Sequence, residues 1–132
     1  MIDHLTLLVR DYDKSRAFYL AALKPLGYEP VMELSKETFP DLPCDRTCGL
    51  GAGGKPDLWL RPADAVSPTH VALTAPNRAA VDAFHKAALA AGAEDHGAPG
   101  LRPHYHPNYY GAFVIDPEGY NLEVVCHDPP AT

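Results

Sequence analysis

Two histidines and one glutamate stand out because they lie in short apolar segments that are typical of strands. His4 opens the segment HLTLLV, His70 opens HVALTA, and Glu123 lies within NLEVV. A carboxylate is costly to bury between Leu122 and Val124 unless it is paired or bound to a metal. Two imidazoles and one carboxylate form a ligand set with open coordination positions, suited to divalent Zn, Ni, Mn, Fe or Co. We therefore predict a metal site made of His4, His70 and Glu123.

An internal repeat relates the two histidines. The heptapeptide AFYLAAL at 17–23 recurs as AFHKAAL at 83–89, an offset of 66 residues, and the same offset places His4 on His70. A histidine in a strand is more often an ordinary hydrogen-bonded residue than a ligand. Two histidines at matching positions of a repeat make the metal interpretation the stronger one.

The last strand of each repeat places Trp59 on Glu123. DLWL in the first half aligns with NLEV in the second at an offset of 64 residues, so two residues were lost from the intervening loops. Trp59 is therefore predicted either to form an aromatic wall of a substrate cleft or to fill the core. The residue that repeats the ligand position of Glu123 cannot itself bind a metal.

Each half predicts the element order strand, helix, strand, strand, strand. The chain is expected to be one domain over 1–132, α+β in class, with two tandem βαβββ modules whose curved mixed sheets enclose a metal-binding cleft. Asp11 or Asp13 should cap the first helix and Asn77 the second. The modules are expected at about 1–62 and 66–128, with strands near 2–9, 28–34, 46–52, 57–61, 69–75, 93–97, 110–116 and 121–127, and helices up to Pro25 and to about Ala91.

The segment RPHYHPNYYG at 102–111 is unusually rich in groups that can transfer or donate protons. In an extended chain His104 and His106 share a face, where they could act as an acid–base pair. Tyr109 or Tyr110 could donate a hydrogen bond to a reacting oxygen. The alternative is a proline-pinned surface loop whose aromatic rings cover a sheet edge. Two further residues of the segment are candidates for substrate binding, namely Arg102, through a substrate carboxylate, and Tyr105.

The other histidines are weaker candidates. His85 and His96 are expected to face solvent, whereas His127 could share the face of Glu123. The three cysteines, Cys44, Cys48 and Cys126, are expected to be reduced thiols, because an odd number of them lies in a chain without a recognisable signal peptide.

Two long segments resemble the vicinal oxygen chelate superfamily. They are IDHLTLLVRDYDKSRAFYLAALKPLGYE, similar to its first module, and YYGAFVIDPEGYNLEVVCH, similar to its terminal hairpin. The superfamily includes glyoxalase I, bleomycin-resistance proteins, fosfomycin-resistance thiol transferases and extradiol dioxygenases. The resemblance implies metal ligation by His4, His70 and Glu123, and a homodimer whose modules pair within or between chains. Glyoxalase I carries a fourth ligand where this chain has Trp59, so the resemblance favours a three-ligand site.

The resemblance implies a glyoxalase-like metalloenzyme, of lyase, isomerase or thiol-transferase type, whose small substrate chelates the metal through adjacent oxygens. Fe(II) extradiol cleavage of a catechol and non-catalytic drug binding are the alternatives. The net charge of −6, with basic residues scattered singly, argues against nucleic-acid and membrane partners. The chain has no long apolar run and is expected to be cytoplasmic.

Overall fold

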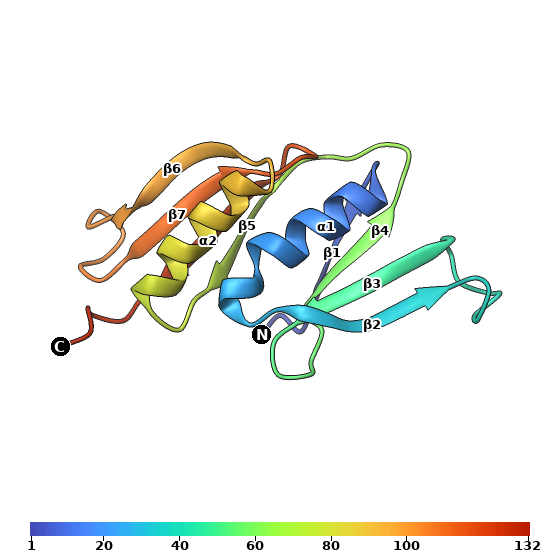
Figure 1. The fold of residues 1–132 in the computed structure, drawn as a ribbon, viewed down its shortest axis with the longest axis horizontal. Coiled ribbons are helices and arrows are strands. Elements are labelled where there is room, and N and C mark those ends of the chain that lie inside the picture. Colours follow the sequence, from blue (N-terminus) through green and yellow to red (C-terminus); the bar gives the residue numbers. More distant parts are fainter.

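Two four-stranded sheets, one from each half of the chain, form the framework of the computed structural model, which describes residues 1–132 (Figure 1). The first half contains β1 (Leu5–Val9), α1 (Tyr12–Ala22), a 3-10 turn η1 (Lys24–Leu26), β2 (Glu29–Ser35), β3 (Arg46–Gly51) and β4 (Leu58–Pro62). The second half contains β5 (His70–Thr74), α2 (Arg78–Ala90), β6 (Glu94–Leu101), β7 (Tyr110–Ile115) and β8 (Asn121–Cys126).

The strand orders β1-β4-β3-β2 and β5-β8-β7-β6 are the same arrangement repeated. In each sheet the strand before the helix pairs in parallel with the last strand, and the other pairs are antiparallel. A parallel pair needs a long crossover, which each helix begins, whereas short turns suffice for the hairpins. The predicted fold class is confirmed: the protein is α+β, with two tandem modules and curved mixed sheets that do not close into a barrel.

Side-chain caps set the start of both helices. The Asp11 carboxylate accepts a hydrogen bond from the Lys14 N–H at 3.1 Å, and the Asn77 side chain accepts one from the Ala80 N–H at 2.8 Å. Of the two residues considered for the first cap, Asp11 is therefore the one used. After α1 the chain tightens into η1, which ends at Gly27 with a φ of 80° that favours glycine.

A single core joins the two modules. It contains 24 buried residues drawn from both helices and both sheets, so the two modules share one hydrophobic core. Helix α1 packs against β4, α2 covers β6, β7 and β8, and the helices pack against each other. In Figure 1 both helices lie on the same side of the strands, so the opposite faces of the sheets carry no helix.

Strand register bears out the repeat. Trp59 of β4 pairs with Thr6 of β1, and Glu123 of β8 pairs with Ala72 of β5. Thr6 and Ala72 are 66 residues apart, the offset read from the sequence, so Trp59 and Glu123 occupy equivalent places. The residues that pair with Trp59 and Glu123 on the strands at their other side, β3 and β7, differ in size. Gly49 lies opposite Trp59 and Phe113 lies opposite Glu123.

Some elements differ from the sequence prediction. Strand β1 begins at Leu5 rather than near residue 2, because its parallel partner β4 begins at Leu58. Strand β6 continues to Leu101 through Gly97, Pro99 and Gly100, a stretch that reads as a turn. The extension is possible because β6 is an edge strand that pairs with β7 alone, and its pairing shifts register around Gly97.

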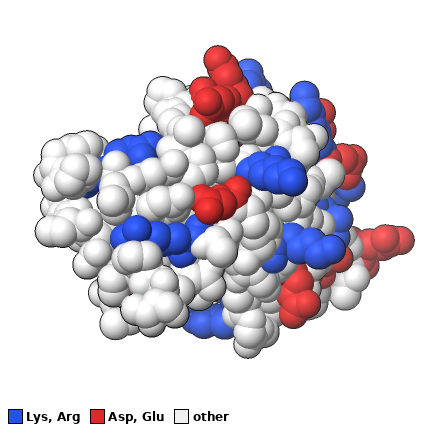
Figure 2. Space-filling view, turned by 60° about the vertical axis from the view of Figure 1, so that its left-hand side comes forward, with Lys and Arg blue, Asp and Glu red and all other residues white.

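The surface has no continuous basic patch on the face drawn in Figure 2, where acidic and basic side chains are interspersed. Cys44, Cys48 and Cys126 form no disulfide, as expected. No helix combines the length and the apolar character needed to cross a membrane.

Candidate metal-binding site

The helix-free face of the second sheet brings His70 and Glu123 into contact. His70 Nε2 lies 3.0 Å from Glu123 Oε2. The two residues belong to adjacent strands, and alternation along β8 places Leu122 and Val124 in the core and Glu123 on the opposite face. The Glu123 side chain is only 3% exposed, whereas that of His70 is 49% exposed. The pair therefore joins a buried carboxylate to an accessible imidazole.

The hydrogen bonds of His70 determine which of its nitrogens is free. Its Nδ1 lies 3.1 Å from the carbonyl oxygen of Asn121, which can only accept, so Nδ1 carries the proton. In the neutral ring Nε2 then presents a lone pair toward Glu123 Oε2. Two acceptors facing each other at 3.0 Å require a proton or a cation between them. A histidine whose other nitrogen donates to a backbone carbonyl is also the usual form of a metal-ligating histidine.

Tyr109 completes the surroundings of the carboxylate. Its hydroxyl donates a short hydrogen bond to Glu123 Oε1, the oxygen that does not face His70. Burial, followed by this hydrogen bond to a carboxylate, raises the pKa of Tyr109 to about 12, so the phenol stays protonated and remains a donor at neutral pH. Gly111 leaves room for the contact, since a Cβ there would lie 3.3 Å from both Glu123 Oε1 and the Tyr109 ring.

A pair of histidines packs beside Tyr109. The His106 and His127 rings are stacked, with His106 Nε2 only 2.5 Å from His127 Nδ1, and both rings meet the Tyr109 ring edge-on. The Asn108 N–H donates to His106 Nδ1 at 3.1 Å, so in neutral His106 the proton is on Nε2 and is donated to His127. His104 is not part of this pair. It is exposed and lies against Tyr105 instead.

His4 and His70 line the same cleft without meeting around one point. The cleft has a volume of about 530 Å³ and lies between the segments around β1 and β5, with Asp57 and Tyr28 also on its walls. The His4 side chain is exposed, and its Nδ1 contacts Asp3 at 2.7 Å. Within one chain no three His, Cys, Asp or Glu side chains gather as a ligand set. The structure thus unites two of the three predicted ligands.

The remaining predicted site residues do not all lie near His70 and Glu123. Arg102 lies over the ring of Phe113, on the face of Glu123, while Tyr105 is exposed and packs against Tyr109. Trp59 lies in the first sheet, close above Gly49. Tyr110 does not reach the site. It is adjacent to Tyr109, and its hydroxyl donates to Asp82 of α2 at 2.6 Å, toward the helix-covered face.

Two contacts in the second module were not expected from the sequence. Phe113 pairs with Glu123 across the strands and stacks on His70, with 6.2 Å between ring centroids. Alternation along β7 could have indicated this face for Phe113. His85 was expected to face solvent, but its side chain is 12% exposed and bonds to Asp95 at 2.9 Å. The bend of β6 that brings Asp95 to α2 has no sequence signal. His96 is exposed, as expected.

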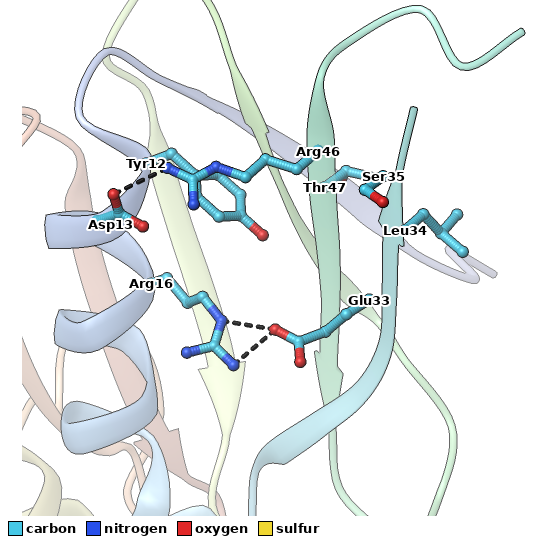
Figure 3. Close-up of a pocket in the computed structure, with 8 residues that line it drawn as sticks. All are labelled: Tyr12, Asp13, Arg16, Glu33, Leu34, Ser35, Arg46 and Thr47. Atoms are coloured by element: carbon cyan, nitrogen blue, oxygen red, sulfur yellow. Dashed lines mark hydrogen bonds and ion pairs between the residues drawn. The ribbon is translucent and has the colours of Figure 1, made fainter. Parts of the chain in front are cut away.

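A separate pocket in the first module has a different character (Figure 3). It lies between α1 and strands β2 and β3 and contains two arginines. Arg16 binds Glu33 at 2.7 Å through Nε, and Arg46 binds Asp13 at 2.8 Å while covering the Tyr12 ring. Both guanidinium charges are thus balanced by carboxylates, and the contacts connect α1 to the sheet. We regard this pocket as structural.

The comparisons with known proteins agree with the fold. Residues 1–124 match the family model of the Glyoxalase/Bleomycin resistance protein/Dioxygenase superfamily, and the chain belongs to that superfamily. Comparison with curated protein sequences gives no match.

Solved structures with the same fold cover nearly the whole chain. A glyoxalase/bleomycin resistance protein from Albidiferax ferrireducens T118 is 21% identical, with a TM-score of 0.72 over 96% of this chain and 97% of its own. A glyoxalase/bleomycin resistance protein/dioxygenase family enzyme from Burkholderia phytofirmans PsJN is also 21% identical, with a TM-score of 0.68 over 96% and 98%. The E144Q mutant of glyoxalase I from Zea mays is 22% identical, with a TM-score of 0.69 over 94% of this chain and 46% of that longer chain.

Proposed function

We propose that the protein is a metal-dependent, glyoxalase-like enzyme whose small substrate binds a divalent ion through two neighbouring oxygen atoms. The observation that carries the proposal is the contact of His70 Nε2 with Glu123 Oε2 at 3.0 Å, while the other ring nitrogen of His70 faces a backbone carbonyl. Two ligand atoms that each lie about 2.1 Å from one ion, at a right angle, are about 3 Å apart. A divalent ion held there would polarise the substrate oxygens and stabilise the negative charge that develops on them.

The surrounding residues fit this role. The Tyr109 hydroxyl holds the second oxygen of Glu123, and the Asn121 carbonyl orients His70, so both ligands have outer partners. Trp59 occupies the place equivalent to Glu123 in the first module, which argues for a three-ligand site without a fourth carboxylate. A lyase, isomerase or thiol-transferase reaction is compatible with such a site. Membership of the superfamily does not decide among these three reaction types.

Metal content tests the proposal. Zn²⁺ or Ni²⁺ bound to the purified protein should be lost in H70A and in E123Q, as measured by elemental analysis and titration calorimetry. H85A is the matched control, because it removes another imidazole that contacts a carboxylate, Asp95, at 2.9 Å. If H70A and E123Q bind as much metal as H85A, then the contact is an ordinary ion pair and the proposal is wrong.

We propose that His4 of a second copy supplies the third ligand. The edge strands β1 and β5 have one paired side each, and Ile2 beside His4 is 86% exposed, which favours a further contact there. In a symmetric dimer, H4A and E123Q chains mixed in equal amounts would regain an intact site in every heterodimer. Metal binding should return to about a quarter of the wild-type level. If the mixture recovers nothing, His4 does not act across chains.

Fe(II) extradiol cleavage is the second candidate. It is favoured by Tyr109, which binds Glu123, and by the His106–His127 pair beside Tyr109, as proton donors and acceptors. Protein loaded anaerobically with Fe(II) and then given catechol and oxygen should produce a coloured ring-opened product if this candidate holds. Non-catalytic drug binding is the third possibility, and the ligand pair argues against it. It would be supported by tight binding of a drug to the metal-free protein.

A further inference from the structure

Arg102 is a cation on the same face of the sheet as His70 and Glu123. Its Cζ lies 5.4 Å from the centroid of the Phe113 ring, and that ring stacks on His70 at 6.2 Å. Phe113 is in register with Glu123 on the neighbouring strand, so the two side chains share a face. The guanidinium, the aromatic ring and the imidazole therefore follow one another across the sheet.

Backbone atoms of β6 hold the Arg102 side chain in place. Gly97 and Gly100 lie under its side chain, since a Cβ at Gly97 would be 3.3 Å from Arg102 Nη2 and one at Gly100 would be 3.1 Å from Nη1. Nη2 also donates to the Ala98 carbonyl at 2.8 Å. Two glycines and a carbonyl thus hold the guanidinium over β6 in a defined position.

No carboxylate of the chain neutralises Arg102. Arg10, Arg16 and Arg46 have acidic partners, whereas Arg61, Arg78 and Arg102 have none. The only acceptor of the Arg102 guanidinium is the Ala98 carbonyl. Of these three arginines, Arg102 is the one that lies over Phe113, on the face of the second sheet that carries His70 and Glu123. A guanidinium left without an anion beside a buried carboxylate–histidine pair is matched to an anionic group from outside the chain.

We infer that the ligand of this site carries an anionic group, a carboxylate or a phosphonate-like group, which binds Arg102 while its other end reaches His70 and Glu123. The inference that one end of this ligand chelates a metal rests on the proposed function, whereas the inference that its other end binds Arg102 does not. Phe113 lies between the two ends, so the ligand spans one aromatic ring and has an apolar middle. The substrate class is thus a short, bifunctional acid with adjacent oxygens at one end.

Three hydroxamates test the inference with Zn²⁺-loaded protein in titration calorimetry. Acetohydroxamate has a neutral tail, the monohydroxamate of succinic acid ends in a carboxylate, and phosphonoacetohydroxamate ends in a phosphonate. At least one anionic probe should bind about tenfold or more tightly than acetohydroxamate, because a charge-assisted hydrogen bond to Arg102 is added. Their order identifies which anion the site prefers. R102Q should abolish the difference, and R102K should keep part of it.

K86Q is the matched control, because it removes the same charge from an exposed residue on α2, across the sheet from Arg102. Equal affinity for all three probes, or loss of the difference in K86Q as much as in R102Q, would overturn the inference. Failure of every hydroxamate would count against the metal site instead. Arg102 is then tested on metal-free protein, where succinate, but not succinamide, should shift the NMR signal of the Arg102 Nε–H. No such shift would refute the anion site.

Discussion

Arg10 and Glu118 join the two modules across 108 residues of sequence. The Arg10 backbone N–H donates to Glu118 Oε1 at 2.8 Å, and the Arg10 Nε donates to Oε2 at 2.9 Å. Asp11 adds a second backbone N–H to Oε1, also at 2.8 Å. The carboxylate in the DPEG turn of the second module thus binds the chain at the end of β1, where α1 begins. This part of the terminal hairpin has a structural role, distinct from that of Glu123.

Replacing Glu118 by Gln should destabilise the protein by about 1–3 kcal/mol, because donors that faced a buried carboxylate lose part of their acceptor. The melting temperature should fall by several degrees at pH 7, as measured by circular dichroism. E37Q, at an exposed position, is the control and should change little. A melting temperature of E118Q equal to that of E37Q would show that the contact contributes nothing.

The effect of E118Q should depend on pH. Burial acts to raise the pKa of Glu118, but hydrogen bonds from the Asp11 and Arg10 N–H groups and the Arg10 side chain outweigh it and lower the pKa below the ordinary 4.5. The stabilisation is therefore complete above about pH 4.5 and is lost as pH falls through the lower folded-state pKa. Asp116, whose pKa is raised mainly by burial, acts oppositely, but it is present in both proteins. The gap between wild type and E118Q should narrow in acid.

Replacing Tyr109 by Phe removes the hydroxyl that orients Glu123. Metal affinity should fall by about ten- to a hundredfold, as loss of an outer partner of a ligand usually causes. The fold should lose on the order of 1 kcal/mol. Y110F is the matched control, since its hydroxyl binds Asp82 on the other side of the sheet. Equal metal affinities in the two variants would exclude an orienting role for Tyr109.

The histidine pair beside Tyr109 has a defined tautomer that NMR can detect. In the neutral ring the proton of His106 should be on Nε2, because Nδ1 accepts from Asn108. Long-range ¹H–¹⁵N spectra report this directly. H127Q should preserve an acceptor for Nε2–H, whereas H127F should not. A proton on Nδ1 of wild-type His106 would contradict the arrangement.

Replacing Trp59 by Glu should place a carboxylate in the first module at the position equivalent to Glu123. Trp59 is placed relative to β1 as Glu123 is to β5, so the new carboxylate would lie on the same strand face as His4. If His4 binds the ion, metal affinity should rise by about tenfold, or 1.4 kcal/mol. W59Q loses the same indole and controls for the destabilisation. Equal affinity in W59E and W59Q would place this position outside the site.

Local patterns predicted most of the fold, while contacts between distant elements escaped them. Residue type and spacing predict the caps at Asp11 and Asn77 and the equivalent positions of Trp59 and Glu123 in the two sheets. The pairing of His106 with His127 depends on how a loop closes over a strand end. The sequence also could not separate Tyr109 from Tyr110, because the choice depends on where β7 begins. His4 is the extreme case, since its proposed partners belong to another molecule.

Because the two modules share one core, ligand binding at one site should change the thermal stability of the whole chain. Because 24 buried residues from both modules form one cluster, the chain should unfold as a unit. By linkage, an ion or small acid that binds only the native face of the second sheet then stabilises α1 and β2 as much as β8. At a hundred times its dissociation constant the gain is about 2.7 kcal/mol. An ordinary melting curve can thus report the binding of metal ions and small ligands at this face.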